Sequence, residues 1–314
     1  MSNNTTRFSS DNSSISCSLN NSKRECDACN HAIFASYIII IILSPVAVMG
    51  NALILASIWK KTFQRTPFHI LLSGLVICDF CTGLIAQPLI AAPNLLYLSR
   101  PRLLTRRIFK TVSTIGFVSG VYFGTTSLLI ITLLSIERWL HMTRRSLVSS
   151  RRAFFTFVMS FLIPIPLVVF SALDFTKERD GREVNITIAV LMLSCYSTTS
   201  FAYFKVFRII RQHQIQVQGN QSTYNFGQPA INLAKYKKSV VSILYILALF
   251  SFCFLPMIVS LALLAHMGIT LETSTAYLAS LALLFLSSSL NPGLYVWRMN
   301  DIRNGVKQLF CTNG

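Results

Sequence analysis

Long apolar stretches alternate with short polar segments along most of this 314-residue chain. Six stretches contain no charged residue, and a seventh is interrupted only by Asp79. The stretches are residues 31–59, 66–99, 111–136, 153–173, 184–204, 239–271 and 273–297. A membrane-spanning helix needs about 20 mostly apolar residues, and backbone groups inside lipid must bond to one another. The pattern therefore predicts an all-α membrane protein with seven transmembrane helices.

Composition argues against the main alternative, in which these stretches are the buried helices of a soluble protein. The chain is 53% hydrophobic and 12% charged, whereas soluble domains carry about 25% charged residues. Seven apolar stretches of this length also exceed what one soluble core of this size needs.

Lys and Arg are unevenly distributed among the segments that join the predicted helices. If the N-terminus lies outside, the cytosolic segments hold 17 of the 28 Lys and Arg residues and two of the 11 acidic residues. Because cytosolic loops are enriched in Lys and Arg, we expect an extracellular N-terminus and a multi-pass protein of the plasma membrane. The net charge of +17 then faces mostly anionic lipid, and its dispersal between spans argues against nucleic-acid binding.

One group of cations falls on the expected extracellular side. It consists of Arg100, Arg102, Arg106, Arg107 and Lys110. These residues either contact an acidic ligand or lie among lipid headgroups, and the sequence leaves both interpretations open.

Polar segments flank the predicted transmembrane domain, 32–297. Residues 1–31 are rich in Ser and Asn and are expected to form a disordered extracellular tail that is glycosylated. Its glycosylation motifs are at Asn3, Asn4, Asn12 and Asn20. Residues 298–314 are expected to form a short amphipathic helix on the inner leaflet and a short cytosolic tail. Cys311 follows that helix and is expected to be palmitoylated or, alternatively, a free thiol.

Three cysteines, Cys17, Cys26 and Cys29, lie in the expected extracellular tail, where disulfides form. At most one pair can close among three, and the sequence does not decide which. Zinc binding by Cys26, Cys29 and His31 lacks a convincing fourth ligand.

Short motifs follow one another on the predicted helices. They are Gly50-Asn51 on the first, Leu75 to Asp79 on the second, Ile136 to Trp139 on the third, Tyr203 on the fifth, Phe250 to Pro256 on the sixth, and Asn291 to Tyr295 on the seventh. Each motif is weak alone, but together and in this order the chain resembles the rhodopsin-like (class A) G protein-coupled receptors over about residues 32–310. The resemblance implies a seven-transmembrane helix bundle with a short amphipathic eighth helix. It also implies a receptor that transmits the binding of an extracellular ligand to a heterotrimeric G protein.

The resemblance further implies an activation switch near the cytosol. In the family, the Arg at the end of the third helix, here Arg138, pairs with the preceding acid, Glu137, at rest. On activation it turns toward the Tyr of the fifth helix, Tyr203, and the G protein. Prolines on the sixth and seventh helices provide flexible points. The residues assigned to this switch are Glu137, Arg138, Tyr203, Phe250, Phe254, Pro256, Asn291, Pro292 and Tyr295.

Asp79 is an acidic residue in the middle of an apolar stretch. Such an acid is energetically unfavourable in lipid and marks a functional position by default. In the family the matching acid belongs to a cluster that holds water and sodium. The corresponding positions here are Asn51, Asp79, Ser127, Ser287, Ser288 and Asn291. Oxygen ligands suit a hard cation, so an allosteric sodium ion is the one cofactor to consider; the alternative is a hydrated Asp79 that only holds helices together.

The ligand is expected to bind among the outer halves of the third, fifth, sixth and seventh helices. Amine receptors carry an Asp where this chain has Gly120, and retinal receptors carry a Lys in the seventh helix, which is absent here. Neither a monoamine nor retinal is therefore expected. The residues assigned to ligand binding are Gly120, Tyr122, Thr125, Tyr277 and Ser280. Gly116, Gly120 and Gly124 indicate either close helix packing or an enlarged cavity for a bulky, lipid-like ligand.

A multi-span transporter or channel is the alternative function. It requires several intramembrane charges or broken helices, and Asp79 is the one residue that qualifies. Enzymatic activity is not expected, because the five His residues lie mainly at helix ends and no nucleophile–base pair is evident.

Overall fold

The computed structural model describes residues 22–60, 66–100, 105–143, 149–176, 181–221 and 229–311. Within these ranges every element is helical, as the apolar pattern predicts. The elements are α1 (Ser22–Lys60), α2 (Pro67–Cys81), the π-helix η1 (Thr82–Ala86), α3 (Gln87–Ser99), α4 (Arg106–Thr143), α5 (Ser150–Leu162), α6 (Ile165–Thr176), α7 (Arg182–Gln221), α8 (Pro229–Met267), α9 (Leu271–Arg298) and α10 (Asn300–Cys311).

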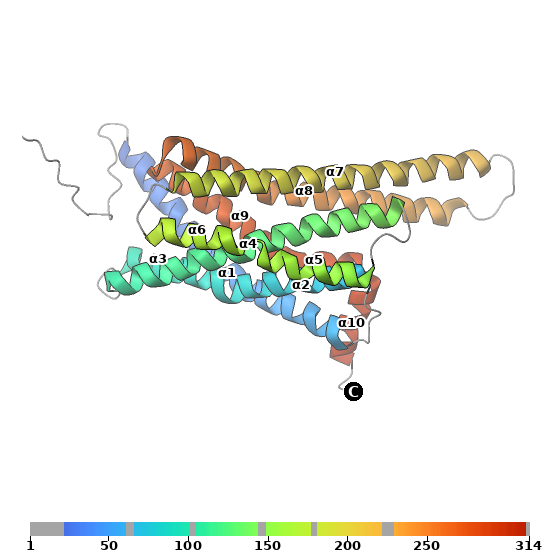
Figure 1. Ribbon diagram of the computed structural model, residues 1–314, viewed down its shortest axis with the longest axis horizontal. Helices are drawn as coiled ribbons and strands as arrows, with labels where there is room; N and C mark the ends of the chain where they lie inside the picture. The colour runs from blue at the N-terminus through green and yellow to red at the C-terminus, as the bar shows by residue number, and fades with distance from the viewer. Residues whose placement is uncertain are drawn as a thin grey trace, which may run out of the picture.

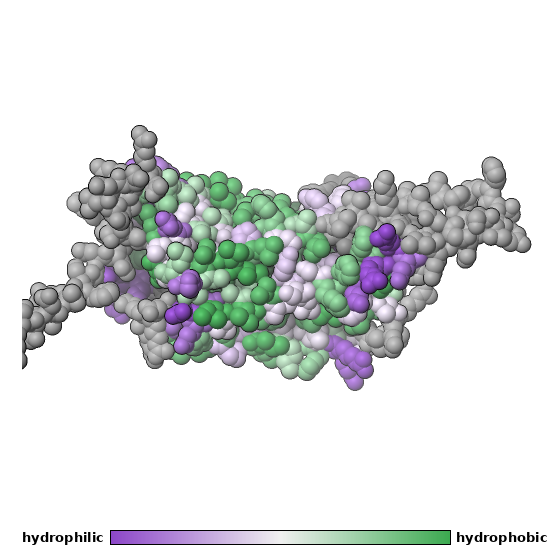
Figure 2. Space-filling model, turned by 90° about the horizontal axis from the view of Figure 1, so that it is seen from above, coloured by the Kyte–Doolittle hydropathy of each residue, from purple (hydrophilic) through white to green (hydrophobic). Residues whose placement is uncertain are grey.

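Seven helical spans within the described residues are long and apolar enough to cross a membrane, which confirms the prediction. The second span consists of α2, η1 and α3, the fourth of α5 and α6, and each of the others of one helix. The spans run along the long axis of the molecule and pack into one bundle (Figure 1). On the face seen in Figure 2, hydrophobic residues form a broad central band and hydrophilic residues lie toward both ends. The chain is therefore a multi-pass membrane protein.

The predicted eighth helix is confirmed as α10, which lies across one end of the bundle (Figure 1). Ile302 of α10 is fully buried in an apolar cluster with Ile54 and Leu72. The Ser57 hydroxyl of α1 donates to the Ile302 carbonyl at 3.4 Å, and a Cβ on Gly305 would collide with the Ser57 side chain. Close packing thus joins α10 to α1. We call this end of the molecule the α10 end and the opposite one, where α1 begins, the far end.

Prolines lie at irregular points of two spans and inside the continuous helices of three others. Pro88 follows the π-helix η1, where the backbone takes one extra residue in a turn and a residue without an N–H is tolerated. The fourth span is broken at residues 163–164, between α5 and α6. Pro45, Pro256 and Pro292 lie inside the continuous helices α1, α8 and α9.

The first helix begins earlier than the sequence predicts. Residues 22–31, assigned to the disordered tail, are helical instead, because α1 starts at Ser22. This segment contains no Gly or Pro, and extending an existing helix gains one backbone hydrogen bond per residue. Cys26 is disulfide-bonded and Cys29 is a free thiol. The four predicted glycosylation sites lie outside the described residues, and Cys311 is the last residue of α10.

The largest buried apolar cluster connects α1, α3, α4, α7, α8 and α9 toward the far end. Its members include Leu128 of α4, Met192 of α7, Phe254 of α8 and Leu281 of α9. Phe250 and Phe254 of the predicted switch belong to this cluster, and Tyr277 packs against it.

Candidate functional site

Asp79 of α2 is 1% exposed and accepts three hydrogen bonds from two other helices. The hydroxyls of Ser288 on α9 and Ser127 on α4 donate to its Oδ1 at 2.9 and 3.4 Å. The side-chain amide of Asn291 on α9 donates to its Oδ2 at 2.7 Å. Because a buried polar group without partners is strongly unfavourable, these bonds hold α2, α4 and α9 together in the middle of the bundle.

Asn51 and Ser287, which the sequence also assigns to this cluster, have different surroundings. The Asn51 amide donates to the carbonyls of Ala47 and Ser288 at 2.8 and 3.1 Å, so it connects α1 to the α9 turn that contacts Asp79. No hydrogen bond joins Ser287 to Asp79 within the described part of the chain. Ser287 instead lines the cavity described below, because successive helix residues point about 100° apart.

The group around Asp79 has the chemistry of a site for a small hard cation. Asp79, Ser127 and Ser288 offer carboxylate and hydroxyl oxygens, the ligands that such ions prefer. The side-chain oxygen of Asn51 is buried and has no partner among the described residues. In the described ranges, this group included, no three His, Cys, Asp or Glu side chains lie close enough together to hold a metal, so a cation here would rely on Asp79 and neutral oxygens. Na⁺ held by Asp79 and its serine neighbours is therefore compatible with the residues present.

A cavity of about 730 Å³, the coupling cavity, lies at the α10 end between α2, α4, α7, α8 and α9. Six of the nine residues assigned to the activation switch line it. They are Glu137, Arg138, Tyr203, Phe250, Asn291 and Tyr295. These residues come from four helices that are distant in sequence, and folding brings them to one surface. Phe254, Pro256 and Pro292 do not line the cavity.

The coupling cavity is rich in positive charge. Arg138 lines it, and Glu137 is 8% exposed. Within the described residues no ion pair joins these two side chains, so the pairing that the resemblance implies at rest is not formed here. Neighbouring helix residues diverge by about 100°, which keeps the two groups apart. Arg298 also lines the cavity, so two fixed cations face the single acid Glu137 in its walls, and this net positive charge favours a negatively charged partner.

Phe250 connects the coupling cavity to the apolar core. Its ring centroid lies 4.3 Å from that of Phe254, and Tyr196 of α7 stacks on it at 5.7 Å. The Tyr196 hydroxyl also forms a hydrogen bond of 2.8 Å with the Ser251 hydroxyl. Two contacts thus join α7 to α8 one to two turns from Pro256. The sequence did not predict a role for Tyr196 or Arg298, because neither belongs to a motif that distinguishes it from similar residues.

Pro292 faces α1 rather than the coupling cavity. A Cβ on Gly50 would lie 2.9 Å from the Pro292 Cγ, so the glycine permits the close contact between α1 and α9. The motifs of the first and seventh spans therefore meet directly.

The residues assigned to ligand binding have varied surroundings. The Tyr122 hydroxyl donates to the Phe161 carbonyl at 3.1 Å and so points to α5. The Thr125 hydroxyl donates to carbonyls of its own helix. Ser280 is buried, and Tyr277 packs against the largest apolar cluster. Tyr277 and Ser280, both on α9, thus remain the polar candidates nearest the core.

The three glycines spaced along α4 differ in how closely α3 approaches them. A Cβ on Gly116 would lie 2.7 Å from the Leu89 backbone, and one on Gly120 would lie 3.1 Å from the Ile90 side chain. A Cβ on Gly124 would meet nothing within 4 Å. Close packing therefore explains Gly116, and α3 occupies the space beside Gly120 where amine receptors carry an acid.

Known proteins share this architecture. Residues 50–295 match the family described as 7 transmembrane receptor (rhodopsin family). A high-affinity lysophosphatidic acid receptor of Xenopus laevis is 23% identical over 303 residues, which cover 85% of this chain and 79% of that receptor. The family match extends from Gly50 on α1 to Tyr295 on α9 and so includes every motif named above. This chain belongs to the rhodopsin family of seven-transmembrane receptors, and it is a G protein-coupled receptor for an extracellular ligand.

Proposed function

We propose that the α10 end of this receptor faces the cytosol and that a heterotrimeric G protein docks in the coupling cavity around Arg138. The ligand then binds at the far end, outside the plasma membrane. The observation that carries this proposal is the convergence of α4, α7, α8 and α9 on one cavity of about 730 Å³ with six switch residues in its walls. The distribution of Lys and Arg supports the orientation.

The walls of the coupling cavity suit the C-terminal helix of a G protein α subunit. Ile131 and Leu134 offer apolar surface to the apolar face of a docked helix. Arg138 and Arg298 offer cations to a carboxylate, and Tyr203 offers a hydroxyl donor. Because the Glu137 carboxylate forms no ion pair with the Arg138 guanidinium, the guanidinium is available to such a partner.

Movement of α8 is the proposed link between ligand and G protein. Pro256 lacks the N–H that would continue the helix ladder, so α8 bends more easily there. Phe254 lies in the apolar core, and Phe250 reaches from the core to the coupling cavity. A ligand that binds one arrangement of this core more tightly shifts the population toward an open or a closed cavity.

The test is a panel of G protein biosensors, each reporting one α-subunit class, in cells that express the full chain. Arg138→Ala is expected to abolish both ligand-free and ligand-driven responses at matched surface expression. Arg151→Ala is the matched control, because Arg151 is exposed on α5 at the same end and does not line the cavity. Full signalling by Arg138→Ala would show that coupling occurs elsewhere.

We further propose a ligand with an anionic headgroup and an apolar tail. The Xenopus laevis relative is described as a lysophosphatidic acid receptor. At the far end, the corner between α3 and α4 is basic, and Tyr97 stacks on Phe109 at 4.5 Å to join the two helices. Its exposed cations are Arg100, Arg106, Arg107 and Lys110. No acid occurs between residues 80 and 136, so this stretch of the chain contributes positive charge alone.

Lysophosphatidic acid and lysophosphatidylcholine, compared in the biosensor assay, test this ligand class. Lysophosphatidic acid is expected to be the stronger agonist. The double variant Arg106→Gln/Arg107→Gln is expected to raise the half-maximal concentration of lysophosphatidic acid by a factor of about ten or more. Arg182→Gln, which removes an exposed cation on α7 at the same end, is the control. Equal potency of the two lipids, or an unchanged double variant, contradicts the proposal.

The proposal for Asp79 is that it binds an allosteric Na⁺. The hydroxyls of Ser127 and Ser288 and the carboxylate of Asp79 support it by their oxygen chemistry and their mutual contacts. Since these residues join α2, α4 and α9, an ion among them would stabilise the arrangement of helices seen here.

A further inference from the structure

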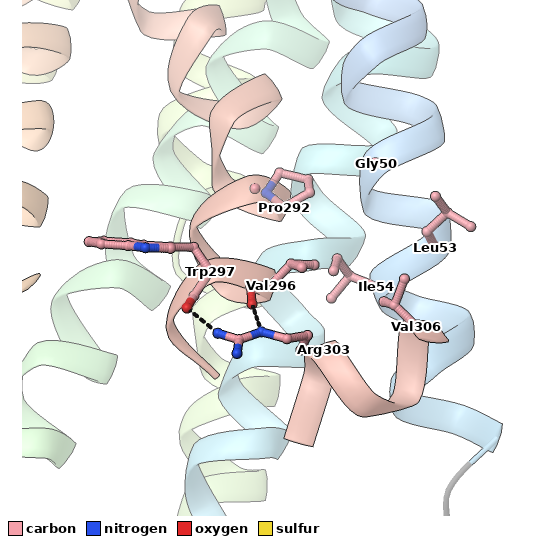
Figure 3. A pocket seen from close by; sticks show the side chains of 9 residues that line it. Gly50, Leu53, Ile54, Pro292, Val296, Trp297, Arg303 and Val306 are labelled. Atoms are coloured by element: carbon pink, nitrogen blue, oxygen red, sulfur yellow. Dashed lines mark hydrogen bonds between the residues drawn. The ribbon is translucent and has the colours of Figure 1, made fainter. Parts of the chain in front are cut away.

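A second cavity, of about 620 Å³, lies between α1, α9 and α10 (Figure 3). We call it the α10 groove. Its apolar walls include Leu53, Ile54, Pro292, Val296, Trp297 and Val306. Leu53 is 38% exposed, so the groove is open to the surroundings of the bundle rather than enclosed. On a membrane protein these surroundings are lipid.

Arg303 of α10 is the one charged residue among the described residues that line the α10 groove. Its Nε donates to the Val296 carbonyl at 3.0 Å, and its Nη2 donates to the Trp297 carbonyl at 2.6 Å (Figure 3). These carbonyls belong to the C-terminal turn of α9, where a cation is favourable. The two bonds fix the guanidinium beside the groove and use two of its five N–H donors. The other three have no partner among the described residues.

An apolar groove with one fixed cation matches an amphiphile that has an acyl chain and an anionic headgroup. Amphipathic helices such as α10 lie where headgroups meet acyl chains, and Trp is enriched at the same depth. An apolar groove at this depth favours a lipid chain over water. The cytosolic leaflet supplies anionic lipids that pair with Arg. We propose that the α10 groove binds an anionic glycerophospholipid of the cytosolic leaflet, with its phosphate on Arg303 and one acyl chain along Leu53 and Val306.

The α10 groove and the coupling cavity lie on opposite faces of the same stretch of α9. Asn291, Leu294, Tyr295 and Arg298 line the coupling cavity. Pro292, Gly293, Val296 and Trp297 line the groove. A lipid in the groove therefore contacts the helical turns that form a wall of the coupling cavity. If it distinguishes two arrangements of these turns, lipid and G protein binding are coupled reciprocally.

A tryptophan placed on the groove wall allows a direct measurement, because bromine on an acyl chain quenches a tryptophan that it touches. The chain has three Trp residues. Replacing all three by Phe and introducing Leu53→Trp leaves one reporter, on the wall that α1 contributes to the groove. The full receptor is placed in nanodiscs of phosphatidylcholine with increasing fractions of brominated phosphatidylserine or, separately, brominated phosphatidylcholine. Half-maximal quenching is expected at an about fivefold lower fraction of phosphatidylserine, the equivalent of about 1 kcal/mol for one cation–phospholipid contact.

Three variants separate groove binding from general surface charge. Arg303→Gln is expected to make the two quenching curves coincide. Lys307→Gln is expected to retain the phosphatidylserine preference, because Lys307 is exposed on the same helix but does not line the groove. Gly293→Leu keeps Arg303 but fills the groove, since a Cβ at Gly293 meets nothing within 4 Å; it is expected to reduce quenching by both lipids. Because Gly293→Leu retains the bonds from Arg303 to α9, it tests occupation of the groove even if Arg303→Gln loosens the packing of α10.

Three results would overturn the proposal. One is equal quenching by the two brominated lipids in the parent. Another is loss of the preference in Lys307→Gln but not in Arg303→Gln, which would assign it to surface charge. The third is quenching that appears only after Cys311→Ser, which would mean that an acyl chain attached to this protein occupies the groove. None of these measurements requires ligand or G protein, so their failure is distinguishable from failure of the proposed function; only the assignment to the cytosolic leaflet rests on the orientation proposed above.

Discussion

The two halves of the bundle differ in what joins their helices. Toward the far end, the largest buried cluster is apolar, and residues such as Phe254 and Leu281 fill the space between helices. From Asp79 to the α10 end, hydrogen bonds between side chains cross from helix to helix, and a cavity of about 730 Å³ separates the helix ends.

This difference indicates which half changes shape during signalling. Apolar side chains pack densely and resist small displacements, because every lost contact opens a void. Hydrogen bonds to Asp79 can be exchanged for bonds to water or an ion. A shift of α9 at this level therefore costs less free energy than a shift within the apolar cluster. An opening of the α10 end, where we propose that a G protein docks, requires the second kind of construction.

The largest effect on stability is expected from Asp79→Ala. Three donors, the hydroxyls of Ser127 and Ser288 and the amide of Asn291, lose their common acceptor while they stay buried. The expected loss is about 3 kcal/mol of unfolding free energy, measured by thermal unfolding of the purified receptor. Asp301→Ala, which removes an exposed acid of α10, is the control and should shift the midpoint little. Equal shifts would show that the polar layer is no more important than the surface.

A smaller loss is expected from Gly116→Ala, which probes the far half. The new Cβ would lie 2.7 Å from the Leu89 backbone, which cannot rotate away, so α3 and α4 must separate. Overpacking of this kind destabilises by about 2 kcal/mol. Gly124→Ala is the matched control: its Cβ meets nothing within 4 Å, and the better helix propensity of Ala predicts a gain of up to about 1 kcal/mol. Similar behaviour of the two variants would refute close packing as the role of Gly116.

Sodium tests whether the polar layer binds an ion. Replacing about 150 mM choline chloride by NaCl is expected to stabilise the receptor by about 1 kcal/mol, the value for an ion at about five times its dissociation constant. Asp79→Asn should lose this stabilisation, and Ser287→Ala should keep it, because no hydrogen bond joins Ser287 to Asp79 among the described residues. Stabilisation of Asp79→Asn by Na⁺ would place the ion elsewhere.

The smallest effect is expected where the two halves meet, at Tyr196. Tyr196→Phe keeps the ring stacked on Phe250 and removes the hydrogen bond to Ser251. A single bond of this kind contributes about 0.5 to 1 kcal/mol, and thermal unfolding measures it. Tyr245→Phe removes an exposed hydroxyl of α8 and should change nothing measurable. Indistinguishable midpoints for the two variants would leave ring packing as the whole link between α7 and α8.

The sequence alone predicted the features of this receptor that follow from the free-energy cost of polar groups in lipid. Seven apolar stretches and an intramembrane acid have few stable solutions, because unpaired backbone and charge are strongly unfavourable in a bilayer. The same reasoning gave α10 from its amphipathic spacing. Residues 22–31 were misassigned, because their polar composition conceals that they extend an existing helix.

Only the tertiary structure decided which side chains meet. Folding brought Arg138, Tyr203 and Tyr295 to one cavity, directed Ser287 away from Asp79, and placed Arg303 beside an apolar groove. These outcomes depend on helix rotation and crossing, which are set by close packing such as that at Gly50, and a pattern of apolar residues does not encode them by itself. For the same reason the sequence revealed the class of receptor, while the surroundings of the residues assigned to its ligand emerged only from the packed helices.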